Sequence, residues 1–266
     1  MIQNVPVASI ICMAVSTIIC FGLPIGLCIY AVKVKKARLG SVALGAMTFF
    51  IAVQIAERIV YQILASVMGA LLGNLLIYGI CAALLAAVFE ETGRFLAFKF
   101  FMKDNVSQEN AFAYGVGHGG MEAMMITGMV MINNITISLA INQGSLNEIF
   151  ETMDDAAKNN LSALWTESPF LFLAGGVERI AAVAIQIALS ILVYKMFETG
   201  KKDFLLLAMA CHFVIDFLTV MLSAYCPVWA TEIIILLCAA SMCRIAYLFC
   251  KQTPAGSADT ERKRTN

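Results

Sequence analysis

Charged side chains are scarce in this chain. Only 14% of its 266 residues are Asp, Glu, Lys or Arg and 61% are hydrophobic, whereas a soluble domain carries about 25% charged residues. The 18 basic residues are matched by 18 acidic ones and are spread over short loops, so no basic patch that would bind nucleic acid is expected. This composition excludes an ordinary soluble domain and predicts a membrane protein.

Motifs of disulfide-rich and zinc-knuckle proteins are also missing. The nine cysteines lie mostly within apolar segments and no two of them have C-x-x-C spacing, so we interpret them as small packing residues. A signal peptide is not expected, because the N-terminus lacks a basic region and the first apolar run is too long. We interpret that run as a retained span.

Long apolar runs follow one another along the whole chain. At about 1.5 Å per residue, each is long enough to cross a hydrocarbon core of about 30 Å. They lie at 8–31, 42–68, 74–98, 111–132, 170–194, 204–224 and 228–249. The sequence thus predicts an all-α polytopic membrane helix bundle of about seven transmembrane helices. We expect a single membrane-embedded domain over residues 1–251 and a disordered cytoplasmic tail over residues 252–266.

Basic residues set the expected orientation. Lys and Arg cluster after the first, third, fifth and seventh runs, so the positive-inside rule places the N-terminus outside and the C-terminus in the cytoplasm. We expect a multi-pass integral protein of a bacterial plasma membrane.

The outer loop at 133–168 has a pattern of its own. Its apolar residues recur at helical spacing, and Ser145 with Glu148 forms a capping-box pattern. These features predict an amphipathic helix at about 145–165 near the outer interface. A packed structural helix and a substrate gate both fit this pattern.

Two adjacent carboxylates, Glu90 and Glu91, are followed by Arg94 near the inner end of the third run. An ionisable side chain inside a bilayer costs a few kcal/mol, so such groups pair, line a wet cavity or do chemistry. Arg94 can reach Glu90 at i+4 or Glu91 at i+3. One such ion pair leaves the other carboxylate free to act as a base.

The two histidines of the chain each precede a carboxylate by four residues, as His118 with Glu122 and His212 with Asp216. Residues four apart share a helix face, so each carboxylate can orient the ring or bind alongside it. Counting from the inner ends of the helices places both histidines and the acidic pair of the third run about 10 to 14 Å deep. We predict one site in the cytoplasmic half of the membrane, around a hydrated pocket reachable from the cytosol.

Glycines surround the first histidine, at positions 115, 117, 119 and 120. They allow close approach of a neighbouring helix or of an extended substrate backbone.

A second polar layer lies in the outer half. Glu57 with Arg58 on the second run and Glu178 with Arg179 on the fifth run share one level. We expect salt bridges between these two helices, with substrate recognition as the alternative.

Three motifs carry a family resemblance. They are E-E-x-x-R at 90–94, H-G-G-x-E at 118–122 and H-x-x-x-D at 212–216. Together they resemble the motifs of YhfC-type membrane proteins, a group similar to the CPBP superfamily of intramembrane proteases, which includes the CAAX-processing enzymes. The resemblance extends from about the third helix to the sixth. It implies a metallopeptidase that hydrolyses peptide bonds within the membrane.

The resemblance also implies roles for single residues. Glu90 would activate water, Glu91 would pair with Arg94, and Asp216 would support His212. His118 and His212 would hold a metal or stabilise an oxyanion.

The metal implied is a divalent cation, expected to be Zn²⁺, although a mechanism through Glu and His alone stays open. Its candidate ligands are His118, His212, Glu90, Glu122 and Asp216.

The sequence departs from the CAAX-type pattern at several places. Those enzymes space the arginine one residue further from the glutamates, and have Phe where Tyr114 stands and Asn where Asp216 stands. The first departure leaves both Glu90 and Glu91 as candidates for the base. The last favours a metal, because an added carboxylate suits a cation.

Alternatives of other classes stay open. A non-catalytic scaffold, receptor or immunity protein could retain the same fold, and His118 with His212 could instead ligate a b-type haem. A transporter is not expected, because no pair of broken helices recurs in the two halves. The expected partners are membrane lipid and a membrane protein or peptide substrate, and neither that substrate nor the oligomeric state follows from the sequence.

Overall fold

The computed structural model describes residues 3–251, which are helical and contain no strand. The helices are α1 (Val7–Lys33), α2 (Leu39–Phe49), η1 (Phe50–Glu57), α3 (Arg58–Met68), η2 (Gly69–Gly73), α4 (Leu75–Leu96), η3 (Ala97–Phe101), α5 (Gln108–Glu122), η4 (Ala123–Gly128), α6 (Met129–Asn142), α7 (Asn147–Thr152), α8 (Asp155–Thr166), α9 (Pro169–Thr199), α10 (Asp203–Tyr225) and α11 (Val228–Lys251). The predicted tail, residues 252–266, lies outside the described residues.

Seven helices in the described part of the chain are long and apolar enough to span a membrane. They confirm the predicted all-α bundle, and the protein is a multi-pass integral membrane protein. The largest difference from the predicted runs lies in the fourth span, which includes α5, η4 and α6 and continues to Asn142. The following loop therefore begins about ten residues later than the sequence suggests.

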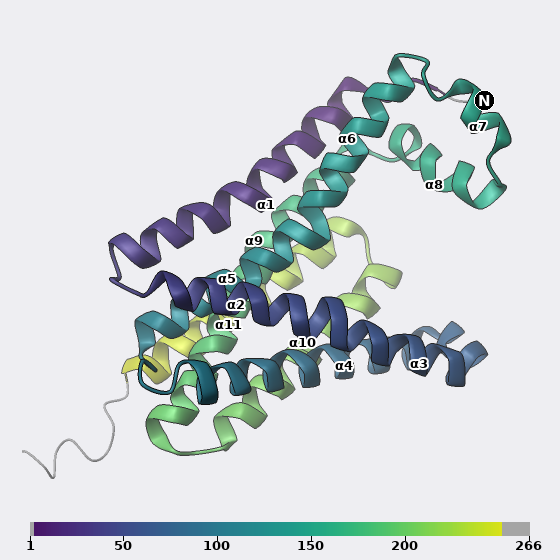
Figure 1. Ribbon diagram of the computed structural model, residues 1–266. Helices are drawn as coiled ribbons and strands as arrows, with labels where there is room; N and C mark the ends of the chain where they lie inside the picture. The colour runs from purple at the N-terminus through teal and green to yellow at the C-terminus, as the bar shows by residue number, and fades with distance from the viewer. Residues whose placement is uncertain (1–2, 252–266) are drawn as a thin grey trace, which may run out of the picture.

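The loop between α6 and α9 contains two short helices where the sequence predicts one. The chain is extended at Met153, between α7 and α8, so the helical pattern is broken there. Asp154 caps α8 by accepting a hydrogen bond from the backbone N–H of Ala157 at 2.7 Å. The predicted capping box is wrong, because α7 begins after Leu146 and has no side-chain cap. Figure 1 shows both helices near the N-terminus, at one end of the bundle.

Helix α9 is the centre of the bundle. In its most apolar window 67% of the residues are buried, against 28% or less in the other spans. It packs against α1, α5, α10 and α11, so four other spans are in contact with this one helix (Figure 1). By contrast, α3 has no buried residue and diverges from α1 and α6 in Figure 1.

The glycines of α5 let neighbouring helices come close. A Cβ on Gly117 would lie 1.9 Å from the carbonyl oxygen of Val42 in α2, and one on Gly45 would lie 2.0 Å from that of Tyr114 in α5. A Cβ on Gly115 would lie 2.6 Å from the backbone of α9. Because helices occupy these positions, the glycines serve helix packing and not the approach of a substrate backbone.

Three stretches of π-helix lie next to the predicted site residues. The π-helix η3 begins three residues after Arg94, and η4 begins directly after Glu122. The third, η1, continues α2 and ends at Glu57. Such wide turns occur often at functional sites, since they change the direction in which side chains project.

We predict that Gly117→Ala destabilises the fold. The added methyl would overlap the backbone of α2, and overpacking of this kind costs about 1–3 kcal/mol or more. Thermal unfolding of the purified protein in detergent should show a lower melting temperature.

Gly26→Ala in α1 is the matched control, because its Cβ would meet nothing within 4 Å. Equal melting temperatures for the two variants would contradict the close approach of α2 and α5.

Candidate active site

Glu91 is held by two partners and has no exposed side-chain surface. Arg94, one turn further along α4, donates from Nη1 to Glu91 Oε1 at 2.5 Å and to Oε2 at 2.6 Å. His212 of α10 places Nδ1 2.8 Å from Oε1. These contacts confirm the predicted ion pair between Glu91 and Arg94 at i+3. Both oxygens of the Glu91 carboxylate are occupied by hydrogen bonds.

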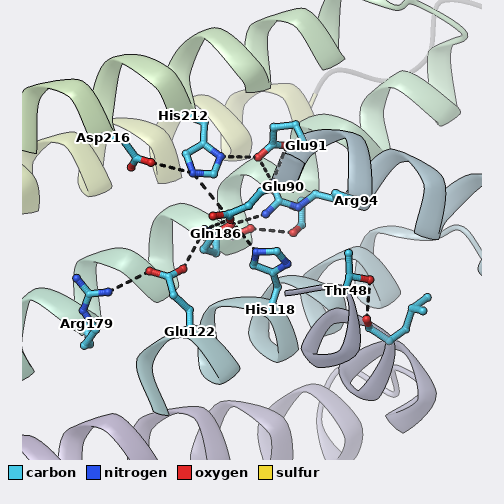
Figure 2. A network of polar contacts seen from close by, with 12 residues as sticks. Thr48, Glu90, Glu91, Arg94, His118, Glu122, Arg179, Gln186, His212 and Asp216 are labelled. Atoms are coloured by element: carbon cyan, nitrogen blue, oxygen red, sulfur yellow. Dashed lines mark hydrogen bonds and ion pairs between the residues drawn. The ribbon is translucent and has the colours of Figure 1, made fainter. Parts of the chain in front are cut away.

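Glu90 projects to a different set of neighbours, because successive helical residues are about 100° apart. Its Oε2 lies 2.8 Å from His118 Nε2 and 3.8 Å from His212 Nε2. Gln186 of α9 donates from Nε2 to the same oxygen at 2.9 Å. Figure 2 shows the carboxylate among the three side chains. The predicted convergence of the acidic pair with both histidines is therefore what the structure shows.

The ring of His118 is fixed by aromatic neighbours. Phe49 of α2 meets it edge-on at a centroid distance of 5.4 Å, and Tyr114 stacks on it at 6.0 Å. Tyr114 is fully buried. It places an aromatic ring at the position where the CAAX-type pattern has Phe. The other ring nitrogen, Nδ1, is buried and has no hydrogen-bond partner among residues 3–251.

His212 presents Nε2 to two carboxylates. That nitrogen lies 3.4 Å from Asp216 Oδ2 and 3.8 Å from Glu90 Oε2, which confirms the predicted pairing of His212 with Asp216. Since Nδ1 faces Glu91, the ring has a carboxylate on each side (Figure 2).

Glu122 has other partners than the sequence suggests. Its Oε1 accepts from Arg179 Nη1 at 3.0 Å, and its Oε2 accepts from Gln186 Nε2 at 3.0 Å. The ring of His118 bonds to Glu90 instead. The expectation that Glu122 orients His118 is wrong, because Glu122 projects toward α9 and meets a guanidinium there.

The predicted salt bridges across the outer polar layer are also wrong. Arg179 pairs with Glu178, its neighbour in α9, and with Glu122 of α5. Across residues 3–251, no ion pair joins Glu57 or Arg58 to α9. The clamp in this layer therefore connects α5 with α9.

Gln186 is the site residue that motif reasoning missed. It belongs to none of the three motifs, yet it contacts Glu90 and Glu122 and accepts a hydrogen bond from Arg94 Nη2. A signal was present: it is a lone amide in the fifth apolar run, eight residues before the end of that run at Tyr194. At about 1.5 Å per residue it lies about 12 Å deep, at the level of the histidines.

A cavity of about 280 Å³ adjoins the site. Its walls include His212, Asp216 and Glu57, with residues of α4, α9 and α10 that lie on the predicted outer side of the histidines. On the predicted inner side, fully buried Phe98 and Leu189 belong to the main hydrophobic core, and Phe98 also lines a cavity of about 370 Å³ with Lys99 and Lys103. Access to the site from the cytosol therefore stays a prediction.

The donor atoms are of the kinds that zinc prefers, since imidazole nitrogens and carboxylate oxygens both bind it. Ligand atoms about 2.0–2.2 Å from a tetrahedral zinc lie about 3.3–3.6 Å apart, whereas Glu90 Oε2 and His118 Nε2 lie 2.8 Å apart, as hydrogen-bonded partners do. His212 also has the outer carboxylate partner typical of metal-bound imidazoles. Among residues 3–251, however, no group of three or more His, Cys, Asp and Glu side chains is already arranged as a metal site.

A bundle of seven spans with a buried Glu/His cluster defines a class of polytopic membrane protein with ionisable side chains inside the bundle. A family model described as YhfC intramembrane metalloprotease matches residues 19–235. The chain belongs to this family. It is 35% identical over 209 residues to the uncharacterized membrane protein YhfC of Bacillus subtilis (strain 168), a match that covers 77% of this chain and 81% of that protein. No solved structure matches the chain significantly.

We predict that Arg94→Leu strongly destabilises the protein. The substitution leaves Glu91 buried without its cation, and breaking a buried ion pair in this way costs about 3–5 kcal/mol. The melting temperature in detergent should fall sharply, and adding Glu91→Gln should restore part of the loss.

Arg244→Leu is the control, because Arg244 is exposed on α11 and forms no ion pair within the described residues. A loss of stability no larger than that of the control would show that the pair does not hold the site together.

Proposed function

We propose that this protein hydrolyses peptide bonds of membrane-embedded proteins or peptides in a bacterial plasma membrane, with Glu90 as the general base. The observation that carries the proposal is the position of Glu90 Oε2, which faces Nε2 of both His118 and His212. A carboxylate between two imidazoles, buried at membrane depth, is more than helix packing requires.

The choice between the two glutamates follows from their partners. Both oxygens of Glu91 are engaged by Arg94, and its side chain is fully buried. Glu90 keeps 7% of its side chain exposed, and no donor within residues 3–251 bonds to its Oε1. Glu90 is thus free to exchange a proton, while Glu91 orients His212.

In the proposed reaction, the water oxygen bonds to the scissile carbonyl carbon while Glu90 takes a proton from that water. Glu90 then gives the proton to the amide nitrogen as the C–N bond breaks. An imidazole N–H donates a hydrogen bond to the carbonyl oxygen as it gains negative charge. Asp216 and Glu91 keep the ring of His212 in place for this step.

The residues that would hold a metal are His118, His212 and Asp216, with Glu90 beside them. A bound Zn²⁺ would make its water more acidic and polarise the substrate carbonyl. Glu122 is omitted from the proposed set, because Arg179 and Gln186 already occupy its oxygens.

We predict that Glu90→Gln abolishes proteolysis and leaves the fold intact, because the amide keeps the shape of the carboxylate but cannot take up a proton. Comparative proteomics of membranes from cells with the wild-type protein and with the variant should show substrates that accumulate and cleavage products that disappear.

Glu109→Gln in the first turn of α5 is the matched control, since Glu109 is exposed and outside the site. Unchanged cleavage of a verified substrate by the Glu90 variant would remove Glu90 from the mechanism.

We predict that His212→Ala loses bound zinc while Glu122→Gln retains it. Nε2 of His212 faces the carboxylates of Glu90 and Asp216, whereas the carboxylate of Glu122 is bound to Arg179. Metal analysis of the purified variants checks this, with a visible absorption spectrum to detect haem. Zinc retained by the histidine variant, or a Soret band in the wild-type protein, would contradict the proposed ligands.

A further inference from the structure

We propose that Gln186 is a positioning residue that fixes the carboxylate of Glu90 between the two imidazoles. This inference rests on the proposed role of Glu90 as the base. Gln186 lies in the middle of α9, the most buried span, and is itself only 4% exposed. A polar amide in such a place needs partners for both of its ends.

Every polar atom of the Gln186 side chain is used. Its Oε1 accepts a hydrogen bond from Arg94 Nη2. Its Nε2 donates to Glu90 Oε2 at 2.9 Å and to Glu122 Oε2 at 3.0 Å. The two hydrogens of the amide nitrogen thus serve two carboxylates, and the oxygen serves a guanidinium.

These partners determine which way the amide points. A guanidinium can only donate, and ionised carboxylates can only accept. If the amide were flipped, its nitrogen would face Arg94 and its oxygen would face Glu90 and Glu122. The orientation with Nε2 toward the carboxylates is therefore the one in which all three contacts are hydrogen bonds.

The same amide separates two acidic groups. Glu90 and Glu122 come from different helices, α4 and α5, and their Oε2 atoms share one amide nitrogen. Without that donor, two buried carboxylates would face each other with nothing between them, and Glu90 would lose the contact that aims it at the histidines. Figure 2 shows Gln186 at this junction, between the Glu91–Arg94 pair and the Glu122–Arg179 pair.

Three side chains that resemble glutamine in size or chemistry do not satisfy this junction. Glutamate would bring a third carboxylate to the other two, and methionine would offer no hydrogen bond to any of the three partners. Asparagine is one methylene shorter, so it would retract the amide from α4 and α5. Gln186→Met is the informative variant because it keeps the length of the side chain.

The test uses the membrane substrate whose cleavage depends on Glu90, with purified protein in detergent. We expect Gln186→Met to lower kcat about 10–100-fold, as is typical when a group supporting a site residue is lost, with KM nearly unchanged. Ser190→Ala is the matched control, because Ser190 is buried one turn along α9 and its hydroxyl, within the described residues, bonds only to the carbonyl oxygen of Gln186. A kcat equal to that of the control, or a rise in KM alone, would overturn the assignment.

A second measurement needs no substrate. In a double-mutant cycle of thermal unfolding with Gln186→Met and Glu90→Gln, the shifts in melting temperature should not add, because the two side chains share a contact. Additive shifts would overturn the proposal. If Glu90→Gln retains cleavage but the shifts are not additive, the proposed base is wrong and the positioning contact stands.

Discussion

Two ionised carboxylates on consecutive residues of a membrane helix impose the main constraint on this structure. Because the two side chains project about 100° apart, one neighbouring side chain cannot pair with both carboxylates. Glu91 turns toward Arg94 and α10, whereas Glu90 turns toward α5 and α9. Four helices therefore have to meet at this level. Together they form a site to which each helix contributes polar groups.

Close packing makes this meeting possible. Helix α5 carries His118 and is surrounded by α1, α2 and α9, at distances that only glycine allows at Gly117 and Gly115. The imidazole is then held by aromatic rings from α2 and from its own helix. A rigid ring beside a buried carboxylate is the preorganised arrangement that proton transfer needs.

The polar groups of α4, α5, α9 and α10 at the site form one connected network. Arg179, which the sequence places in an outer layer, binds Glu122, and Gln186 joins that pair to Glu90. The cavity beside His212 follows the same direction, toward the predicted outer side. Glu57 and Asp216 also lie along this wall.

The sequence by itself determined the class of fold, the seven spans and the partners that lie within one helix. Hydrophobicity fixes the spans, and helical spacing fixes the pairs Glu91–Arg94 and His212–Asp216, because these depend only on local geometry. Depth counting also brought the histidines and the glutamates to one level, since the rise per residue is constant. The family motifs gave the same residues.

Only the tertiary structure decided which helix each side chain faces. Rotation of a helix about its axis is set by packing against its neighbours, and the sequence of one helix does not contain it. Glu122 shares a face with His118 by spacing, yet it meets Arg179. Gln186 reaches Glu90 and Glu122 because α9 packs beside both α4 and α5. The position of the cavity beside His212 was decided in the same way, because its walls come from several helices.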